Sequence, residues 1–272
     1  MTFTCIPADC ALIPPMSQAT AKICGLTTPE AVASALEGRA SHLGFVFFDK
    51  SPRNIAPQAA FRLAQGARGR ARIVALLVDP DDRQLAEAVE GLAPDLIQLH
   101  GRESPQRAAE VGRVTGLPVI KAVGVRDASD VQAALVFDGA VDHLMFDAKA
   151  PFGADRPGGH GAAFDWTILE GVKTQRPWFL AGGLDPWNVG EALGLSHAPL
   201  VDVSSGVERG AGLKDPVLIS DFLAGGLDPW NVGEAIAISG APLVDVSSGV
   251  ERGAGLKDPA LISAFLDAVR RA

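Results

Sequence analysis

The chain has 272 residues, 47% of them hydrophobic, and a formal net charge of -8. This apolar content excludes a disordered protein, and the length can bury a full core in one large domain or two modest ones. The acidic balance argues against nucleic acid or an anionic membrane as a partner, although a small basic pocket could still bind a phosphate. Apolar stretches such as 44–48 and 73–78 fall far short of the roughly 20 residues that cross a bilayer.

Residues 1–20 read as a flexible tail ahead of a single domain at 21–272. The tail contains three prolines and Asp9 and has no basic leader, which predicts a cytoplasmic protein without a signal peptide. Two of the three cysteines, Cys5 and Cys10, lie in this tail, so no disulfide framework is indicated.

After residue 20, short apolar runs alternate with longer amphipathic runs. Helix-start signals such as Thr28-Pro29 and Ser104-Pro105 place a hydroxyl side chain at the cap and proline in the first turn. The predicted strands are 21–24, 43–48, 73–78, 96–99, 119–123, 144–146, 178–181 and 200–203. The predicted helices are 29–36, 57–65, 82–91, 105–114, 128–136, 164–172 and 187–195.

Continuous apolar strands that alternate with helices predict a parallel sheet covered by helices. Eight such units in about 220 residues fit a closed (β/α)8 TIM barrel. A doubly wound open sheet is the alternative. We favour the barrel because eight strands are predicted and no glycine-rich fingerprint follows the first of them.

The last quarter of the chain contains an internal repeat. Residues 179–221 recur at 222–264 with differences at only six of the 43 positions. We interpret the repeat as a tandem duplication of the last two β/α units. Ten strands would widen the barrel and leave its interior unfilled, so we expect one copy to be extruded from it.

Either copy can supply the last two strands. Contiguity favours the first copy of strand seven, with Gly182 and Gly183. For strand eight the choice stays open, because contiguity favours Asp202 and Ser205, whereas the AISGAP stretch ahead of Val244 favours Asp245 and Ser248 in the second copy. An extruded unit would expose apolar surface, which predicts a monomer or a homodimer.

Polar residues at the carboxyl ends of the predicted strands are the candidates for a site. Cys24, His100 and Asp147 end three strands, and Ser204-Ser205-Gly206 follows a fourth. Each also has a structural interpretation: a buried cysteine packs as a small apolar group, an aspartate braces a loop, a histidine orients or packs, and glycines form tight turns. No paired histidine spacing or Cys-x-x-Cys occurs, so we expect no metal site.

Seven motifs in order resemble phosphoribosylanthranilate isomerase, the isomerase of tryptophan biosynthesis. They cover the chain from about residue 21 to the end, and the departures are the tail and the second copy. The motifs are KICG (22–25), GFVFFDKSPRNI (44–55), IQLHG (97–101), FDA (146–148), GGHGAAFDW (158–166), FLAGGLDPWNV (179–189) and VDVSSGVERGAGLKD (201–215).

The resemblance implies an Amadori rearrangement of a small sugar phosphate, with no cofactor. It assigns Cys24 as general base, with a thiol pKa lowered by a helix start, and Asp147 as a protonated general acid. Arg53 would pair with the anthranilate carboxylate, and Asp202 would support the site. The implied substrate-binding group is Arg53, His100, Gly182, Gly183, Asp202, Ser204, Ser205 and Gly206, with duplicate candidates Gly225, Gly226, Asp245, Ser247, Ser248 and Gly249.

Two other functions compete with this one. The histidine-pathway isomerase runs the same rearrangement but prefers carboxylates at the ends of strands one and five, where this chain has Cys24 and the KAVGV stretch. An inactive scaffold, spoiled by the repeat, is the second alternative, and the intact candidate residues argue against it.

Overall fold

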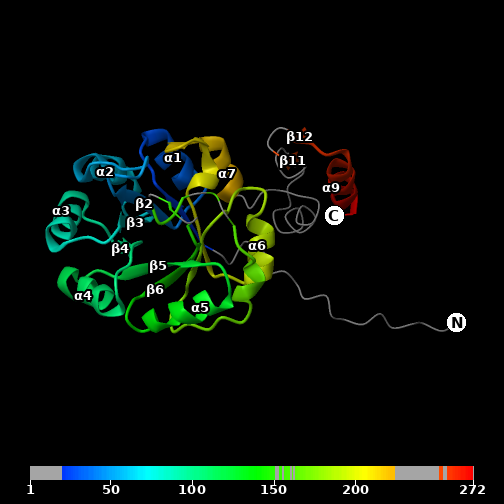
Figure 1. The fold of residues 1–272 in the computed structure, drawn as a ribbon. Coiled ribbons are helices and arrows are strands. Elements are labelled where there is room, and N and C mark those ends of the chain that lie inside the picture. The colour runs from blue at the N-terminus through cyan, green and yellow to red at the C-terminus, as the bar shows by residue number, and fades with distance from the viewer. Residues whose placement is uncertain are drawn as a thin grey trace.

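The computed structural model describes residues 20–150, 153–154, 156–159, 161, 163–223, 251–253 and 256–271. Its centre is a closed barrel of eight strands in chain order, paired parallel throughout (Figure 1). The strands are β1 (Thr20–Cys24), β2 (His42–Phe47), β3 (Arg72–Leu77), β4 (Leu96–Leu99), β5 (Val119–Val125), β6 (His143–Ala148), β7 (Phe179–Leu180) and β8 (Leu200–Val203). The predicted barrel is therefore confirmed, and the open sheet is excluded.

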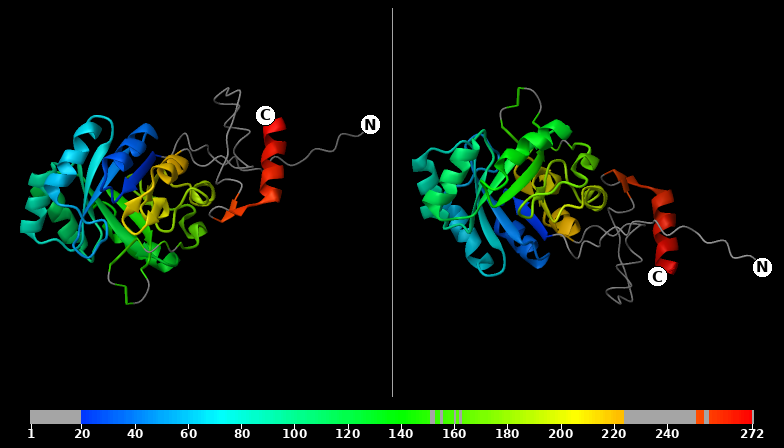
Figure 2. Two further views of the ribbon diagram at one scale, coloured as in Figure 1. Left: turned by 90° about the horizontal axis from the view of Figure 1, so that it is seen from above. Right: turned by 90° about the horizontal axis from the view of Figure 1, so that it is seen from below.

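Helices surround the barrel on its outside (Figures 1 and 2). The first turns form as expected, since Thr28 caps α1 by accepting from the Ala31 N–H and Ser104 caps α4 by accepting from the Arg107 N–H. The helices around the barrel are α1 (Pro29–Glu37), α2 (Pro57–Ala64), α3 (Asp82–Leu92), α4 (Pro105–Thr115), α5 (Ala128–Ala134), α6 (Val189–Ser196) and α7 (Pro216–Leu223). Short 3-10 helices are η2 (Gln65–Ala67), η3 (Leu135–Phe137), η4 (Trp166–Leu169) and η5 (Ser205–Val207). None of the helices within the described ranges is long and apolar enough to span a membrane.

The predicted α-helix at 164–172 is wrong. Only the 3-10 helix η4 forms there: the Asp165 carboxylate caps its start by accepting the N–H and the hydroxyl of Thr167, and Glu170 leaves the helical region with a ψ of 126°. Gly171 then takes a left-handed φ of 73°, which ends any helical path toward β7.

The core lies in two places. Inside the barrel, residues such as Val74, Ile120, Met145 and Phe179 fill the lower interior. Between strands and helices, a second apolar cluster buries the opposite strand faces together with the inner helix faces. Because successive strand side chains alternate between these layers, polar side chains on the inward positions collect at the open end of the barrel.

Both final barrel strands come from the first repeat copy. β8 pairs with β1, with Asp202 opposite Lys22, and closes the cylinder. α7 lies against α1, where the Ser34 hydroxyl donates to the Pro216 carbonyl at 2.7 Å. The first copy is thus the one that builds β7 and β8, as expected for β7.

The described part of the second copy lies outside the eight barrel strands. β11 (Glu251–Gly253) and β12 (Leu256–Lys257) form their own two-stranded sheet, and α9 (Pro259–Arg271) is drawn apart from the barrel helices (Figure 2). The duplicate site candidates Gly225, Gly226, Asp245, Ser247, Ser248 and Gly249 lie outside the described residues. The predicted tail does too, except that Thr20 already belongs to β1.

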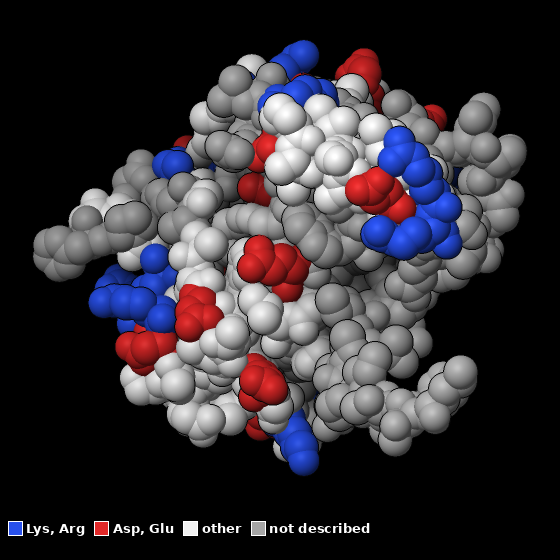
Figure 3. Space-filling view, turned by 90° about the vertical axis from the view of Figure 1, so that its right-hand side faces the viewer, with Lys and Arg blue, Asp and Glu red and all other residues white. Residues whose placement is uncertain are grey.

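On the face in Figure 3, basic side chains of the described residues form small groups beside acidic ones. This face therefore offers no continuous basic surface for a nucleic-acid backbone among those residues. The pattern agrees with the acidic overall charge of the chain.

The buried His42 predicts a pH-dependent stability. Its Nδ1 lies 2.8 Å from the Ser41 hydroxyl and its ring packs edge-on against Phe179, while Nε2 has no partner in the structure. Burial, reinforced by the charge of Lys22, lowers the pKa of His42 to about 3. An unfolded histidine titrates near 6.5, so the unfolded chain binds the extra proton between these values. The free energy of unfolding therefore falls as the pH falls through that window.

We expect His42 to cost about 2 kcal/mol of stability between pH 6.5 and pH 5. Urea unfolding at both pH values should show a smaller loss for His42→Leu than for the unchanged protein. The same substitution at the exposed His197 is the matched control. An equal pH response in the unchanged protein and His42→Leu would contradict the prediction.

Candidate active site

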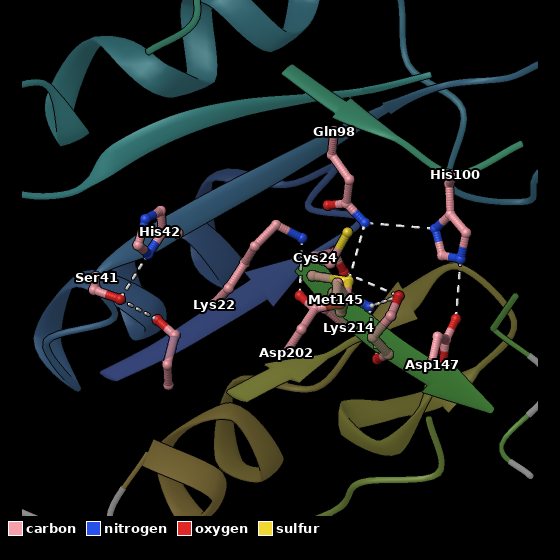
Figure 4. Close-up of polar contacts among 12 residues, drawn as sticks. Lys22, Cys24, Ser41, His42, Gln98, His100, Met145, Asp147, Asp202 and Lys214 are labelled. Atoms are coloured by element: carbon pink, nitrogen blue, oxygen red, sulfur yellow. Dashed lines mark hydrogen bonds and ion pairs between the residues drawn. The ribbon is translucent and has the colours of Figure 1, made fainter. Parts of the chain in front are cut away.

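A pocket opens at the carboxyl ends of the barrel strands. Nine of the residues proposed from the sequence line it: Cys24, Arg53, His100, Asp147, Gly182, Gly183, Asp202, Ser204 and Ser205. Cys24 and Asp147 come from β1 and β6, which are not neighbours in the barrel, yet both side chains line this one pocket (Figure 4). A small ligand in the pocket would therefore have a thiol and a carboxyl within reach.

The thiol side of the pocket is built around a buried lysine. Lys22 precedes Cys24 by two residues and shares its strand face, and its Nζ lies 2.8 Å from Asp202 Oδ1. Burial alone would lower the pKa of Lys22, but the Asp202 carboxylate outweighs burial and raises it. Lys22 therefore stays charged beside the sulfur.

The expected lowering of the thiol pKa is not observed. Burial raises the pKa of Cys24, and the positive charges of Lys22 and Lys214 oppose this without reversing it. The cations near the sulfur are lysine side chains and not the start of a helix. In the ligand-free pocket the sulfur is consequently held as a thiol.

The carboxyl side places two polar side chains in direct contact. His100 Nε2 lies 3.0 Å from Asp147 Oδ2, and the other carboxyl oxygen accepts the Ala148 N–H at 2.9 Å. Gln98, on the same strand face as His100, approaches the other ring nitrogen at 3.5 Å (Figure 4). The Asp147 carboxyl is thereby fixed in orientation from both sides.

Arg53 reaches the pocket from the loop after β2, but its guanidinium is already paired. Nε and Nη2 donate to the two carboxylate oxygens of Glu208 at 2.7 and 2.9 Å, a bidentate geometry. Lys214 Nζ donates to Glu208 at 2.6 Å. Burial alone would raise the pKa of Glu208, yet Arg53 and Lys214 bring it below its usual value.

Sequence reasoning missed Glu208 and Lys214. They follow η5 in β9 (Glu208–Gly210) and β10 (Leu213–Lys214), a small hairpin outside the barrel, so no strand-end rule points to them. The available signal was their position within the motif at 201–215, where they are two of the four charged residues that follow the serine pair.

Two loops close the far wall of the pocket without bulky side chains. Gly182 has a left-handed φ of 84°, and a Cβ there would overlap the Ala148 backbone. A Cβ on Gly206 would overlap the Leu184 carbonyl, so the loops after β7 and β8 pack together only because this residue is glycine. Ser205 lines the pocket, whereas the Ser204 hydroxyl is committed to the Cys24 carbonyl at 3.1 Å.

A closed parallel barrel with polar side chains gathered at its open end is the architecture of a (β/α)8-barrel enzyme. The family model for N-(5'-phosphoribosyl)anthranilate isomerase matches residues 21–223 and matches again at 220–268. The chain belongs to this family. The second match coincides with the second repeat copy.

Individual relatives agree. The N-(5'-phosphoribosyl)anthranilate isomerase of Caulobacter vibrioides is 58% identical over 203 residues, covering 74% of this chain and 93% of the relative. The crystal structure of phosphoribosyl anthranilate isomerase from Thermotoga maritima superposes with a TM-score of 0.69 at 33% identity, covering 76% of this chain and 98% of that one. Another isomerase structure, solved in complex with reduced 1-(o-carboxyphenylamino)-1-deoxyribulose 5-phosphate, has a TM-score of 0.66 at 31% identity, covering 76% of this chain and 97% of that one.

Proposed function

We propose that the protein converts N-(5'-phosphoribosyl)anthranilate into 1-(2-carboxyphenylamino)-1-deoxyribulose 5-phosphate in tryptophan biosynthesis. The single observation that carries the proposal is the placement of Cys24 and Asp147 around one pocket at the open end of the barrel. A relative solved in complex with the reduced form of this product supports it. The proposed enzyme is cytoplasmic.

In the first step Asp147 is the general acid. Its proton goes to the ring oxygen of the sugar, the C1'–O bond breaks, and the anthranilate nitrogen lone pair forms a C1'=N bond. His100, at 3.0 Å, holds the carboxyl in the orientation that this transfer requires. The open-chain cation that results has an acidic hydrogen on C2'.

In the second step Cys24 is the general base. The thiolate removes the C2' proton, and the electron pair moves toward nitrogen to give an enolamine. The enolamine becomes the ketone when C1' gains a proton and the C2' hydroxyl loses its own. Because the sulfur starts as a thiol, it must first lose its proton, and Lys22 and Lys214 are the charges that stabilise the thiolate. The reaction is an isomerisation with no net oxidation, so its balance needs no cofactor.

The remaining pocket residues would hold the two anionic ends of the substrate. Backbone N–H groups of the loops at Gly182-Gly183 and Ser205-Gly206 would bind the phosphate, since the glycines permit close approach. Arg53 would face the anthranilate carboxylate. The repeat at 222–264 is, in this proposal, a duplicated unit extruded from the barrel, and none of its residues is needed in the site.

Rescue of a tryptophan auxotroph that lacks this isomerase tests the proposal. The intact gene should restore growth without tryptophan, whereas genes carrying Cys24→Ala or Asp147→Asn should not. Growth with tryptophan and equal protein levels are the controls. Failure of the intact gene at a normal protein level would favour the inactive scaffold.

A further inference from the structure

Three buried charges meet beside the pocket: Arg53, Glu208 and Lys214. Their side chains are 6%, 4% and 0% exposed. Glu208 contacts both cations and also accepts the Gly212 N–H at 3.1 Å. Its carboxylate is therefore the hub that joins the β2 loop to the β9–β10 hairpin.

The cluster does not balance to zero charge. Arg53 and Lys214 are two cations, and Glu208 is one anion, so one positive charge is left over. Without Lys214, the bidentate Arg53–Glu208 pair would be neutral and would offer little attraction to another carboxylate. With Lys214 protonated, the Glu208 charge is shared and the cluster presents a net positive charge to the pocket that Arg53 lines.

The remaining edge of the guanidinium faces a gap made by glycine. A Cβ on Gly159 would lie 2.6 Å from Arg53 Nη1, and a Cβ on Gly25 would lie 2.6 Å from Arg53 Cδ. Since Nε and Nη2 are both directed at Glu208, the Nη1 edge is the one turned toward the pocket wall at Gly159. The orientation of Arg53 is thus set by its pairing with Glu208.

We propose that Glu208 and Lys214 are positioning residues for substrate recognition: Glu208 fixes the plane of Arg53, and Lys214 supplies the charge that lets Arg53 attract the substrate carboxylate. The inference rests on the proposed function, because it requires a ligand with that carboxylate. It assigns carboxylate selectivity to a pair of residues that do not themselves touch the ligand.

The same lysine is also connected to the backbone of Cys24. Lys214 Nζ donates to the Ser204 carbonyl at 2.8 Å, and the Ser204 hydroxyl donates to the Cys24 carbonyl at 3.1 Å. Effects on turnover would therefore mix two roles. Equilibrium binding of a product analogue isolates the role of Lys214 in carboxylate recognition, because binding involves no proton transfer by Cys24.

A pH-dependent affinity follows from the charge of Lys214. Burial lowers the pKa of Lys214 to about 8, with Glu208 and Cys24 opposing the shift and Arg53 adding to it. As the pH rises through this value, the cluster loses its surplus charge, while phosphate and carboxylate groups on a ligand are already ionised. Binding of a carboxylated ligand should weaken between pH 7 and pH 9.

Calorimetric titration with two ligands tests the inference. One is reduced 1-(o-carboxyphenylamino)-1-deoxyribulose 5-phosphate, and the other is the same molecule without the carboxyl group. Lys214→Met should weaken binding of the first at least tenfold at pH 7, the effect of a unit charge as far as roughly 12 Å away at an effective dielectric constant of about 20, and leave the second nearly unchanged. It should also abolish the weakening between pH 7 and pH 9.

Glu208→Gln provides a second variant of the same shape. Loss of the anion should lower the pKa of Lys214 further, so the weakening should begin at a lower pH. The repeat supplies matched controls, since Glu251 and Lys257 are the counterparts of Glu208 and Lys214 in the second copy. Glu251→Gln and Lys257→Met should bind both ligands as the unchanged protein does.

Equal losses for the two ligands in Lys214→Met would overturn the inference, because the lysine would then serve the phosphate or the fold. Unchanged binding in Lys214→Met, or an equal effect in Lys257→Met, would overturn it as well. Absence of binding by the unchanged protein would contradict the proposed function. Tight binding with no difference between variants would contradict only the inference made here.

Discussion

Cys24→Ala and Asp147→Asn should each lower kcat by about 10²–10⁴-fold, the usual contribution of a positioned acid or base. The change at Cys24 removes the only group that can take the C2' proton in the proposed mechanism, and the change at Asp147 removes the transferable proton. KM should change little, since neither side chain is assigned to the phosphate or the carboxylate. The double variant should be far less impaired than the product of the two single effects.

Steady-state kinetics with purified proteins checks this result. Cys10→Ala, a cysteine in the N-terminal segment, is the matched control and should leave kcat unchanged. Circular dichroism of each variant shows whether the fold persists. A kcat above one tenth of the original in folded Cys24→Ala would mean that the sulfur is not the base.

Deletion of residues 179–221 should give an active enzyme that is more stable than the enzyme made by deleting residues 222–264. The deletion joins Trp178 directly to the second copy, whose sequence repeats the first with six differences. Among the first-copy residues that are buried in the structure, only Leu193 differs, becoming Ile236. Every other buried contact that closes the barrel can therefore form again.

The stability gain has a specific backbone source. His197 ends α6 in the left-handed region with a φ of 53°, and its counterpart in the second copy is Gly240. Glycine occupies this region without the cost of about 1–2 kcal/mol that a side chain incurs. The terminal helix also runs to Arg271 in α9, whereas α7 ends at Leu223.

Deletion of residues 222–264 is the matched control, because it also leaves one copy and the complete terminal helix. Both shortened proteins should turn over substrate within a few-fold of the full chain. In urea unfolding, the protein without 179–221 should be about 1–2 kcal/mol more stable than the other. Inactivity of that protein, with activity in its counterpart, would show that the second copy cannot build the site.

Most barrel strands could be predicted because each one is a short apolar run, a pattern that depends only on neighbouring residues in the sequence. Strands such as Leu96–Leu99 and Leu200–Val203 match their predicted bounds, since apolar runs between turn signals allow few other assignments. The helix predicted at 164–172 is shorter than expected because Glu170 is extended and Gly171 takes a left-handed φ, and the apolar pattern does not indicate where that turn falls.

The site was predictable only where the strand-end rule applies. Cys24, His100 and Asp147 end strands, so their convergence on one opening follows from the topology. Glu208 and Lys214 lie in a hairpin after η5, and only the three-dimensional path brings them to Arg53. The raised pKa of Cys24 likewise depends on burial at the pocket floor, which no linear pattern encodes.

For strand eight, the sequence left the choice between repeat copies open for a different reason. Two nearly identical segments carry the same local preferences, so strand eight could be assigned to either. The structure uses Leu200–Val203, which follows β7 through the short α6 and needs no long connection. Chain connectivity therefore determines which copy supplies strand eight, because the strand propensities of the two copies are the same.

The central claim is that Cys24 and Asp147, on opposite walls of one barrel, isomerise the same sugar phosphate. Fluorescence-monitored turnover of N-(5'-phosphoribosyl)anthranilate by the purified full-length protein tests it most directly. We expect the substrate fluorescence to decay in proportion to enzyme concentration, and Cys24→Ala to abolish the decay above the spontaneous rate. A folded full-length protein that leaves the spontaneous rate unchanged would contradict the claim.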